Sequence, residues 1–375
     1  MNGRLKELAR IFLRLGATSF GGPAVHIAQM EGEFVRERAW LSQQEFLDML
    51  SACNLIPGPN STEMALHVGL KRAGWRGMLV AGLCFILPAF LLVLSLAWAY
   101  KAYGSLPQSE ALLRGVKPVV LAVLVQALWS LGRTTLKGVE TAVLGGLCLA
   151  AALYGLQEVA ILFAAGAAWM AYRGYVMKGM GLGATALITG TSSAGIPLAV
   201  LTPPSLGALF WVFFKAGACL FGSGYVLLAF LRTDLVLIHG WLSESQLLDA
   251  TAIGQVTPGP VFTTATFIGY LIAGPWSALL CTVAIFLPAF VLVPLSAPWV
   301  ERARKSAAAS AFLDGVNAAS LALMAAVLLS LAGPAMGSAR GALWAVLSVG
   351  LLLFARVSSA WLLVAGAALG LLGVL

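Results

Sequence analysis

Long apolar stretches, separated by short polar or charged connections, run from one end of the chain to the other. Residues 77–100 and 112–131 are each long enough to cross a hydrocarbon layer, which takes about 20 residues of helix. Further apolar stretches start at Leu8, Val139 and Val159. This pattern predicts an all-α, polytopic membrane protein with no separate soluble domain.

A strong helix break lies inside the stretch from residue 42 to residue 70. Ser42 and Glu45 fit a capping box, so a helix is predicted to start there. It stops at Pro57-Gly58-Pro59, because proline lacks the amide hydrogen that a helix interior needs. The helix that follows, residues 60–70, is too short to cross the membrane alone. We therefore predict a broken, re-entrant pair of half-helices.

The apolar stretch from Leu8 to Met30 is also interrupted, at Phe20-Gly21-Gly22-Pro23. We predict a single crossing with a break near its middle. Gly21, Gly22 and the later Gly222 would allow a close approach of the backbone to a substrate. The alternative is that these glycines serve helix packing through small residues.

The second half of the chain repeats the first. Three pairs of motifs lie 201 positions apart: Phe20-Gly21 and Phe221-Gly222, Trp40-Leu41-Ser42 and Trp241-Leu242-Ser243, and Pro57-Gly58-Pro59 and Pro258-Gly259-Pro260. Leu87-Pro88-Ala89-Phe90 recurs 200 positions later as Leu287-Pro288-Ala289-Phe290. A register kept over so long a stretch predicts an internal duplication.

The duplication divides the chain into a first repeat at residues 1–172, a linker at 173–205 and a second repeat at 206–375. With about five transmembrane helices in each repeat, an odd number, the second repeat would be inverted relative to the first. The fold class predicted is thus two inverted-topology repeats, each with a broken half-helix pair. Within the linker, 181–201 is apolar enough for an additional span to remain an alternative.

Composition agrees with a membrane protein and excludes several functions. The chain is 60% hydrophobic and 10% charged, whereas soluble domains carry about 25% charged residues. Its net charge of +8 is spread over short loops, which argues against nucleic acid as a partner. The five cysteines are isolated and the three histidines are far apart, so we expect no metal, no cofactor and no enzyme activity.

The two Pro-Gly-Pro breaks are the predicted anion site. The first amides of a helix have no partner within it, and the helix dipole adds positive potential there, so helix starts bind anions. The alternative is a kinked helix whose polar groups only satisfy freed carbonyls. The predicted substrate-binding residues are Pro57, Gly58, Pro59, Asn60, Ser61 and Thr62 in the first repeat, and Pro258, Gly259, Pro260, Val261, Phe262, Thr263 and Thr264 in the second.

Two aligned cations, Arg14 and Lys215, stand on apolar faces, each seven positions before the glycine of a Phe-Gly break. Ionisable residues within a span usually face a partner or a substrate path. We expect them to converge on one site for an anion, unless their side chains extend to opposite interfaces instead. Asn54 and Gln255, also aligned, either donate to the ligand or cap the preceding helix.

Glu63 has no acidic counterpart in the second half. A lone carboxylate beside an anion site is a candidate carrier of a coupling proton, and a structural ion pair is the alternative. No phosphate-binding loop for ATP is present, so energy is expected from an ion gradient or from exchange.

At Phe20-Gly21-Gly22-Pro23, Pro57-Gly58-Pro59 and Leu87-Pro88-Ala89-Phe90, with their second-half partners, the chain resembles the chromate ion transporter family in its long, two-domain form. The resemblance implies export of chromate across the bacterial inner membrane and chromate resistance. The second half departs from the motif of the first at Ser223-Gly224, where the first half has Gly22-Pro23.

The function expected is therefore secondary active export of a tetrahedral oxyanion, chromate or a sulfate-like ion. The alternatives are an uptake carrier or channel for sulfate-like anions, and a membrane reductase, which would need a redox centre. Besides the oxyanion, the expected partners are the lipid bilayer, a coupling proton and, in a homodimer, a second copy of the chain.

Overall fold

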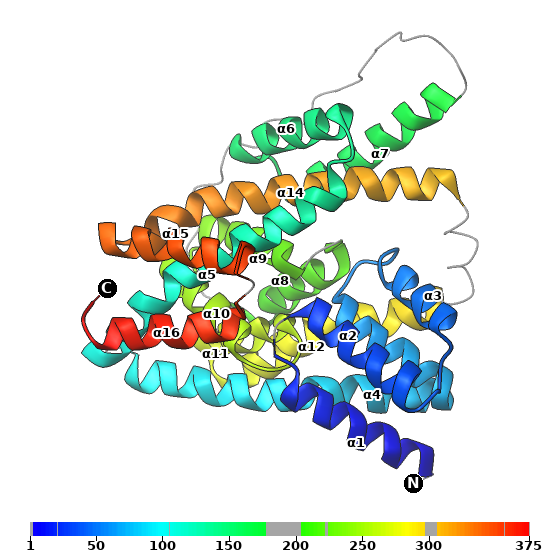
Figure 1. The fold of residues 1–375 in the computed structure, drawn as a ribbon, viewed down its shortest axis with the longest axis horizontal. Helices are drawn as coiled ribbons and strands as arrows, with labels where there is room; N and C mark the ends of the chain where they lie inside the picture. The colour runs from blue at the N-terminus through cyan, green and yellow to red at the C-terminus, as the bar shows by residue number, and fades with distance from the viewer. Residues whose placement is uncertain are drawn as a thin grey trace.

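The computed structural model describes residues 3–20, 22–104, 106–177, 204–221, 224–296, 306–355 and 357–374, and throughout these ranges the ordered elements are helices. Gly21, Gly222 and the stretch 181–201 lie outside the described residues. The first half contains α1 (Gly3–Thr18), α2 (Pro23–Glu31), the π-helix η1 (Gly32–Glu37), α3 (Gln43–Cys53), α4 (Asn60–Tyr103), α5 (Pro107–Thr135), α6 (Val139–Leu153) and α7 (Glu158–Met177). The second contains α8 (Leu206–Cys219), η2 (Gly224–Val226), α9 (Leu227–Leu231), η3 (Arg232–Ile238), α10 (Glu244–Val256), η4 (Val261–Thr263), α11 (Thr264–Ala273), α12 (Pro275–Ser296), α14 (Ala307–Met336), α15 (Ala339–Leu353) and α16 (Ser359–Leu371) (Figure 1).

Four of the described helices, α4, α5, α12 and α14, are long and apolar enough to cross a membrane. α4 and α5 contain the spans predicted at 77–100 and 112–131, and α12 and α14 stand at the corresponding places in the second half. The prediction of an all-α polytopic membrane protein is confirmed. α6, α15 and α16 are shorter apolar helices.

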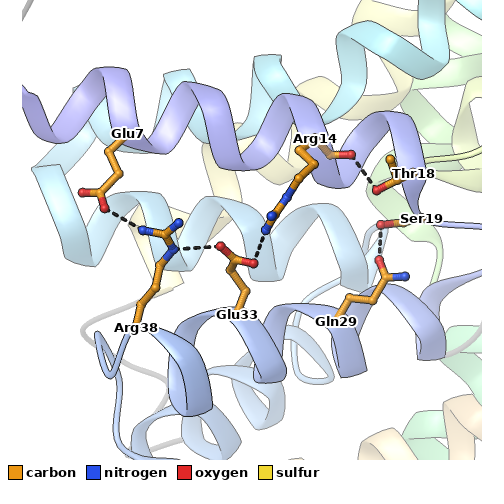
Figure 2. Close-up of polar contacts among 7 residues, drawn as sticks. All are labelled: Glu7, Arg14, Thr18, Ser19, Gln29, Glu33 and Arg38. Carbon is orange, nitrogen blue, oxygen red and sulfur yellow. Dashed lines mark hydrogen bonds and ion pairs between the residues drawn. The ribbon is translucent and has the colours of Figure 1, made fainter.

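The single crossing predicted from Leu8 to Met30 is wrong. α1 and the continuous α2–η1 segment lie antiparallel. Arg14 near the end of α1 pairs with Glu33 at the start of η1, and Glu7 near the start of α1 lies 2.8 Å from the Arg38 guanidinium after η1 (Figure 2). The chain reverses between Thr18 and Pro23. Gly22 makes this reversal possible with a φ of 80°, and Pro23 then starts α2 with its φ already helical.

The second predicted break is present and also forms a hairpin. α3 begins with the predicted capping box, in which the Ser42 side chain accepts from the Glu45 amide and Glu45 accepts from the Ser42 amide. After Pro57-Gly58-Pro59, α4 runs back alongside, so that Lys71 reaches Glu45. At Gly74, with a φ of 63°, α4 bends, and its second section begins.

The second half builds the same two hairpins. Lys215 of α8 lies 2.7 Å from Asp234 of η3, and both residues stand 201 positions after Arg14 and Glu33. The capping box recurs at Ser243. Gly274 separates α11 from α12 with a φ of 82°, matching the bend at Gly74. Each half therefore contains two helical hairpins, which precede the second section of α4 in the first half and α12 in the second.

The two halves interlock through their last helices. The α6–α7 pair of the first half packs on α14, and the α15–α16 pair of the second half packs on α5. Gly115 of α5 lies against the backbone of Gly366, and Gly315 of α14 lies against that of Ala165. Small residues at these crossings let the helix backbones approach closely.

The equivalent long helices α5 and α14 run in opposite directions. In Figure 1, α5 starts at the left of the view and runs to the right, whereas α14 starts at the right and runs to the left. The two helices pack against each other, so they form an antiparallel pair.

We expect Gly115→Ala to destabilise the protein, because the added methyl group would overlap the carbonyl of Gly366. Overpacking of this kind costs about 1–3 kcal/mol. The measurement is the thermal unfolding of the detergent-purified protein. Gly132→Ala on the same helix is the control, since its new methyl group would meet only the Leu321 side chain, at 3.9 Å. Equal melting temperatures for the two variants would show that the α5–α16 crossing does not depend on close approach.

Candidate functional site

A cavity of about 280 Å³ lies where four interrupted segments of the chain meet. The segments that follow the Phe-Gly breaks contribute Pro23, Ala24 and Gly224, and those that follow the Pro-Gly-Pro breaks contribute Pro59, Asn60, Ser61, Pro260, Val261 and Phe262. Ala127, Ser130, Leu131 and Thr134 of α5 complete the lining. The two predicted helix starts thus share one cavity.

In both halves, residues whose backbone amides lack an acceptor within the described ranges line this cavity. The amides of Asn60, Ser61, Val261 and Phe262 have no acceptor among the described residues, and all four residues line the cavity. Amides at helix starts, together with the dipole of the first section of α4, favour an anion. The arrangement therefore suits a small, negatively charged ligand.

The amides of Thr62 and Thr263 do not contribute in the way expected. Thr62 donates to the Pro59 carbonyl at 2.8 Å, and Thr263 donates to the Pro260 carbonyl at 3.0 Å. In both halves the first turn is closed by a bond between residues three positions apart, the tighter pattern that is frequent at helix starts. Two free amides remain in each half instead of three.

The breaks are held by reciprocal bonds between the halves. The Gly58 amide donates to the Leu220 carbonyl at 2.8 Å, and the Gly259 amide donates to the Ser19 carbonyl at 2.9 Å. Each break is thus bonded to the Phe-Gly turn of the other half. Contacts that are exchanged in this way are those of a twofold relation. Gly259 has a φ of 87°, which favours glycine there.

The side chains that line the cavity are uncharged. Asn60, Ser61, Ser130 and Thr134 supply the polar groups. The Asn60 side-chain amide donates to the side-chain oxygen Oδ1 of Asn54 at 2.8 Å. Asn54 therefore orients a lining residue, rather than lining the cavity itself. An anion here would be bound by amides and hydroxyl groups.

The contribution of α5 was not predicted. Ser130 and Thr134 stand one helical turn apart, so both face the same side of α5. A polar pair at this spacing near the end of an apolar span was the signal available in the sequence. Their second-half counterparts, Ser330 and Pro334, do not line this cavity. The site is therefore lined more heavily by the first half.

Arg14 and Lys215 do not converge on the cavity. Arg14 pairs with Glu33, which also accepts from Arg38 at 2.7 Å, and Figure 2 shows this chain of ion pairs between α1 and the antiparallel segment. Lys215 pairs with Asp234. Each cation thus has a carboxylate partner on the neighbouring arm of its own hairpin, which explains why a charge is tolerated on an apolar face.

Glu63 is completely buried one turn after Asn60. Neither of its carboxyl oxygens has a hydrogen-bond partner among the described residues, so the structural ion pair considered for it is not formed. The side chain lies directly against Gly58. His67, one turn further along α4, is also buried, and its Nε2 has no partner in the described part of the chain.

The remaining predicted residues lie around the site. Pro57, Pro258 and Gly22 form its turns, and Gln255 is buried near the end of α10. The Thr263 and Thr264 hydroxyl groups donate to the carbonyls of Pro260 and Val261 at 2.8 and 2.7 Å. These hydroxyl groups therefore bond to carbonyls within the first turn of the second half.

Comparison with known proteins identifies relatives over almost the whole chain. The family model described as "Chromate transporter" matches residues 6–195 and 207–371. The chromate transport protein of Cupriavidus metallidurans is 33% identical over 97% of this chain and 92% of its own length. That of Pseudomonas aeruginosa is 32% identical over 87% of this chain and 80% of its own.

A shorter relative matches only part of the chain. The uncharacterized transporter YwrB of Bacillus subtilis is 31% identical over 43% of this chain and 81% of its own length. No solved structure matches the chain.

We expect a negative charge in the cavity to abolish anion binding. Val261→Asp places a carboxylate among the free amides, and two like charges 4 Å apart repel by about 4 kcal/mol at an effective dielectric constant of about 20. The rise in melting temperature that sulfate gives the purified protein should require sulfate concentrations about a hundredfold higher or more. Val261→Asn, equal in size but neutral, is the control. If both variants respond to sulfate like the parent, anions do not bind in this cavity.

Proposed function

The chain belongs to the chromate transporter family, and we propose that it is a secondary active transporter that exports chromate from the bacterial cytoplasm across the inner membrane. This export would make cells resistant to chromate. The observation that carries the proposal is the shared cavity, which is lined in both halves by residues whose backbone amides have no acceptor in the described part of the chain. Chromate is a tetrahedral dianion, and such amides suit its oxygens.

We propose that the two halves, 1–172 and 206–375, are inverted repeats. The antiparallel course of α5 and α14 and the reciprocal bonds of Gly58 and Gly259 both support an inverted twofold relation. A relative matched by 43% of this chain supports a unit of about one half. In such transporters, substrates bind near the midplane between the repeats, and access alternates between the two sides.

Glu63 is the proposed carrier of a coupling proton. Burial of a charged carboxylate without a partner is costly, so a carboxyl group in this place exchanges a proton when its access to water changes. Glu63 packs under Gly58, whose amide joins the two halves, and movement of this break would therefore change its surroundings.

Direct contact of chromate with Arg14 or Lys215 stays a prediction. Each cation would first have to exchange its carboxylate partner, Glu33 or Asp234, for the oxyanion. We place these ion pairs in the hairpins that support the cavity.

The proposal is tested by chromate flux in inside-out membrane vesicles that contain the protein. An exporter accumulates chromate in these vesicles when a proton gradient is imposed. An uptake carrier would accumulate chromate only in right-side-out vesicles, and a channel would only equilibrate it. Val261→Asn and Val261→Asp serve as the active and inactive controls. Absence of gradient-driven accumulation in inside-out vesicles would contradict the proposed export.

We expect Glu63→Gln to remove the dependence of flux on the proton gradient, because glutamine fills the same space but carries no exchangeable proton. Chromate binding to the purified variant should stay within about twofold of the parent. Glu110→Gln, an exposed position in the first turn of α5, is the control and should leave flux and coupling unchanged. Normal gradient-driven accumulation by Glu63→Gln would exclude Glu63 as the carrier.

A further inference from the structure

A second cavity, of about 190 Å³, shares no lining residue with the first and contains a cluster of basic side chains. It is lined by Arg4, Trp40, Leu41, Val68, Lys71 and Arg72. These residues come from the first turn of α1, the turn before α3, and the end of the first section of α4. We call this cavity the basic pocket.

Positive charge exceeds negative charge around the basic pocket. Arg4 has no ion-pair partner among the described residues. Lys71 pairs with Glu45, while Arg72 lies 3.4 Å from Glu7, which also binds Arg38. The Nε of Arg72 is buried, and within the described ranges nothing accepts its hydrogen. An anion in the pocket would balance the excess positive charge.

The Arg72 guanidinium is held in place by an aromatic ring. Its central carbon lies 4.1 Å from the ring centroid of Trp40, the geometry of a cation–π contact. The contact fixes the planar guanidinium at the wall of the pocket. A fixed guanidinium loses little entropy when it binds a phosphate group.

The internal repeat shows that the fold itself does not need these charges. The positions that correspond to Arg4, Lys71 and Arg72 are Ser205, Leu271 and Ile272, whereas Trp40 and Leu41 are retained as Trp241 and Leu242. The second half thus builds the same corner without basic residues. The three cations are specific to the first half, which indicates a ligand there.

The basic pocket lies where the lipid-facing surface of α4 begins. Trp75 follows the bend at Gly74 and is 61% exposed. Leu83, Leu87 and Leu91 then stand one turn apart on the outer face, each about half exposed. Tryptophan and basic residues at the end of such a face mark the level of the lipid headgroups.

We propose that the basic pocket binds the phosphate group of an anionic phospholipid, with the acyl chains lying along the exposed apolar face of α4. Phosphate is the headgroup component that a cluster of arginine and lysine recognises, and pockets of this kind bind acidic lipids in other membrane proteins. A free oxyanion has the same tetrahedral chemistry but gains nothing from the neighbouring apolar surface. The position of the pocket at the headgroup level therefore favours the lipid.

The test is native mass spectrometry of the delipidated, full-length protein titrated with phosphatidylglycerol or with phosphatidylcholine. We expect one phosphatidylglycerol to bind more tightly than phosphatidylcholine. Each basic residue at a membrane surface contributes about 1 kcal/mol, which corresponds to about fivefold in affinity. Arg4→Ser should therefore weaken the first binding step about fivefold, and Arg4→Ser combined with Lys71→Leu and Arg72→Ile, which copies the second half, roughly a hundredfold.

The control is Arg76→Ala, which removes an adjacent cation that contacts Trp75 and does not line the pocket. It should leave the first binding step unchanged. Arg4→Ser breaks no ion pair, so it stays informative if the triple variant fails to fold. Unchanged phosphatidylglycerol binding in Arg4→Ser, or an equal loss in Arg76→Ala, would overturn the proposal. Displacement of the lipid by millimolar chromate or inorganic phosphate would assign the pocket to a free oxyanion, which also overturns it.

Discussion

Backbone amides that a broken helix leaves unpaired must find acceptors, because the membrane interior offers little water to replace them. At the two Pro-Gly-Pro breaks, the acceptors come from the opposite half. Gly58 bonds to Leu220 and Gly259 bonds to Ser19, so each half completes the other at the point where its own helix is interrupted. The next two amides in each half have no acceptor among the described residues, and the residues that carry them line the cavity. The two bonds that join each break to the opposite half therefore also position the neighbouring amides that suit an anion.

The residues that line this cavity are uncharged, and the ion pairs lie in the helical hairpins beside it. The Arg14–Glu33 and Lys215–Asp234 pairs lie between the arms of the first hairpin of each half. Their equivalent placement supports a structural role, since each pair offsets a cation on an apolar face. Glu63 differs, because its carboxyl group has no partner among the described residues and no acidic counterpart in the second half. The two ion pairs, which occur in both halves, therefore fit a role in stabilising the fold. Glu63, which occurs only in the first half, fits the proposed role in proton coupling.

The sequence predicted the duplicated breaks, the capping box at Ser42, and the shared position of the two helix starts. It did not predict the reversal after Thr18, because a Gly-Gly-Pro interruption looks the same whether the helix continues or turns back. This error also hid the Arg14–Glu33 pair, since residues 19 positions apart meet only when the chain reverses. The lining by Ser130 and Thr134 depends on how α5 is rotated in the packed structure, which hydrophobic pattern alone did not fix.

The exchange of terminal helix pairs between the halves has a consequence for synthesis. α6 and α7 emerge from the ribosome long before α14, the helix that they cover, has been made. Until then the first half exposes a surface whose partner is absent, so the final packing of both halves has to wait for the last third of the chain. A protein that carried only one such half would expose the same surface but lack the helix that covers it, and a second molecule would have to supply that helix.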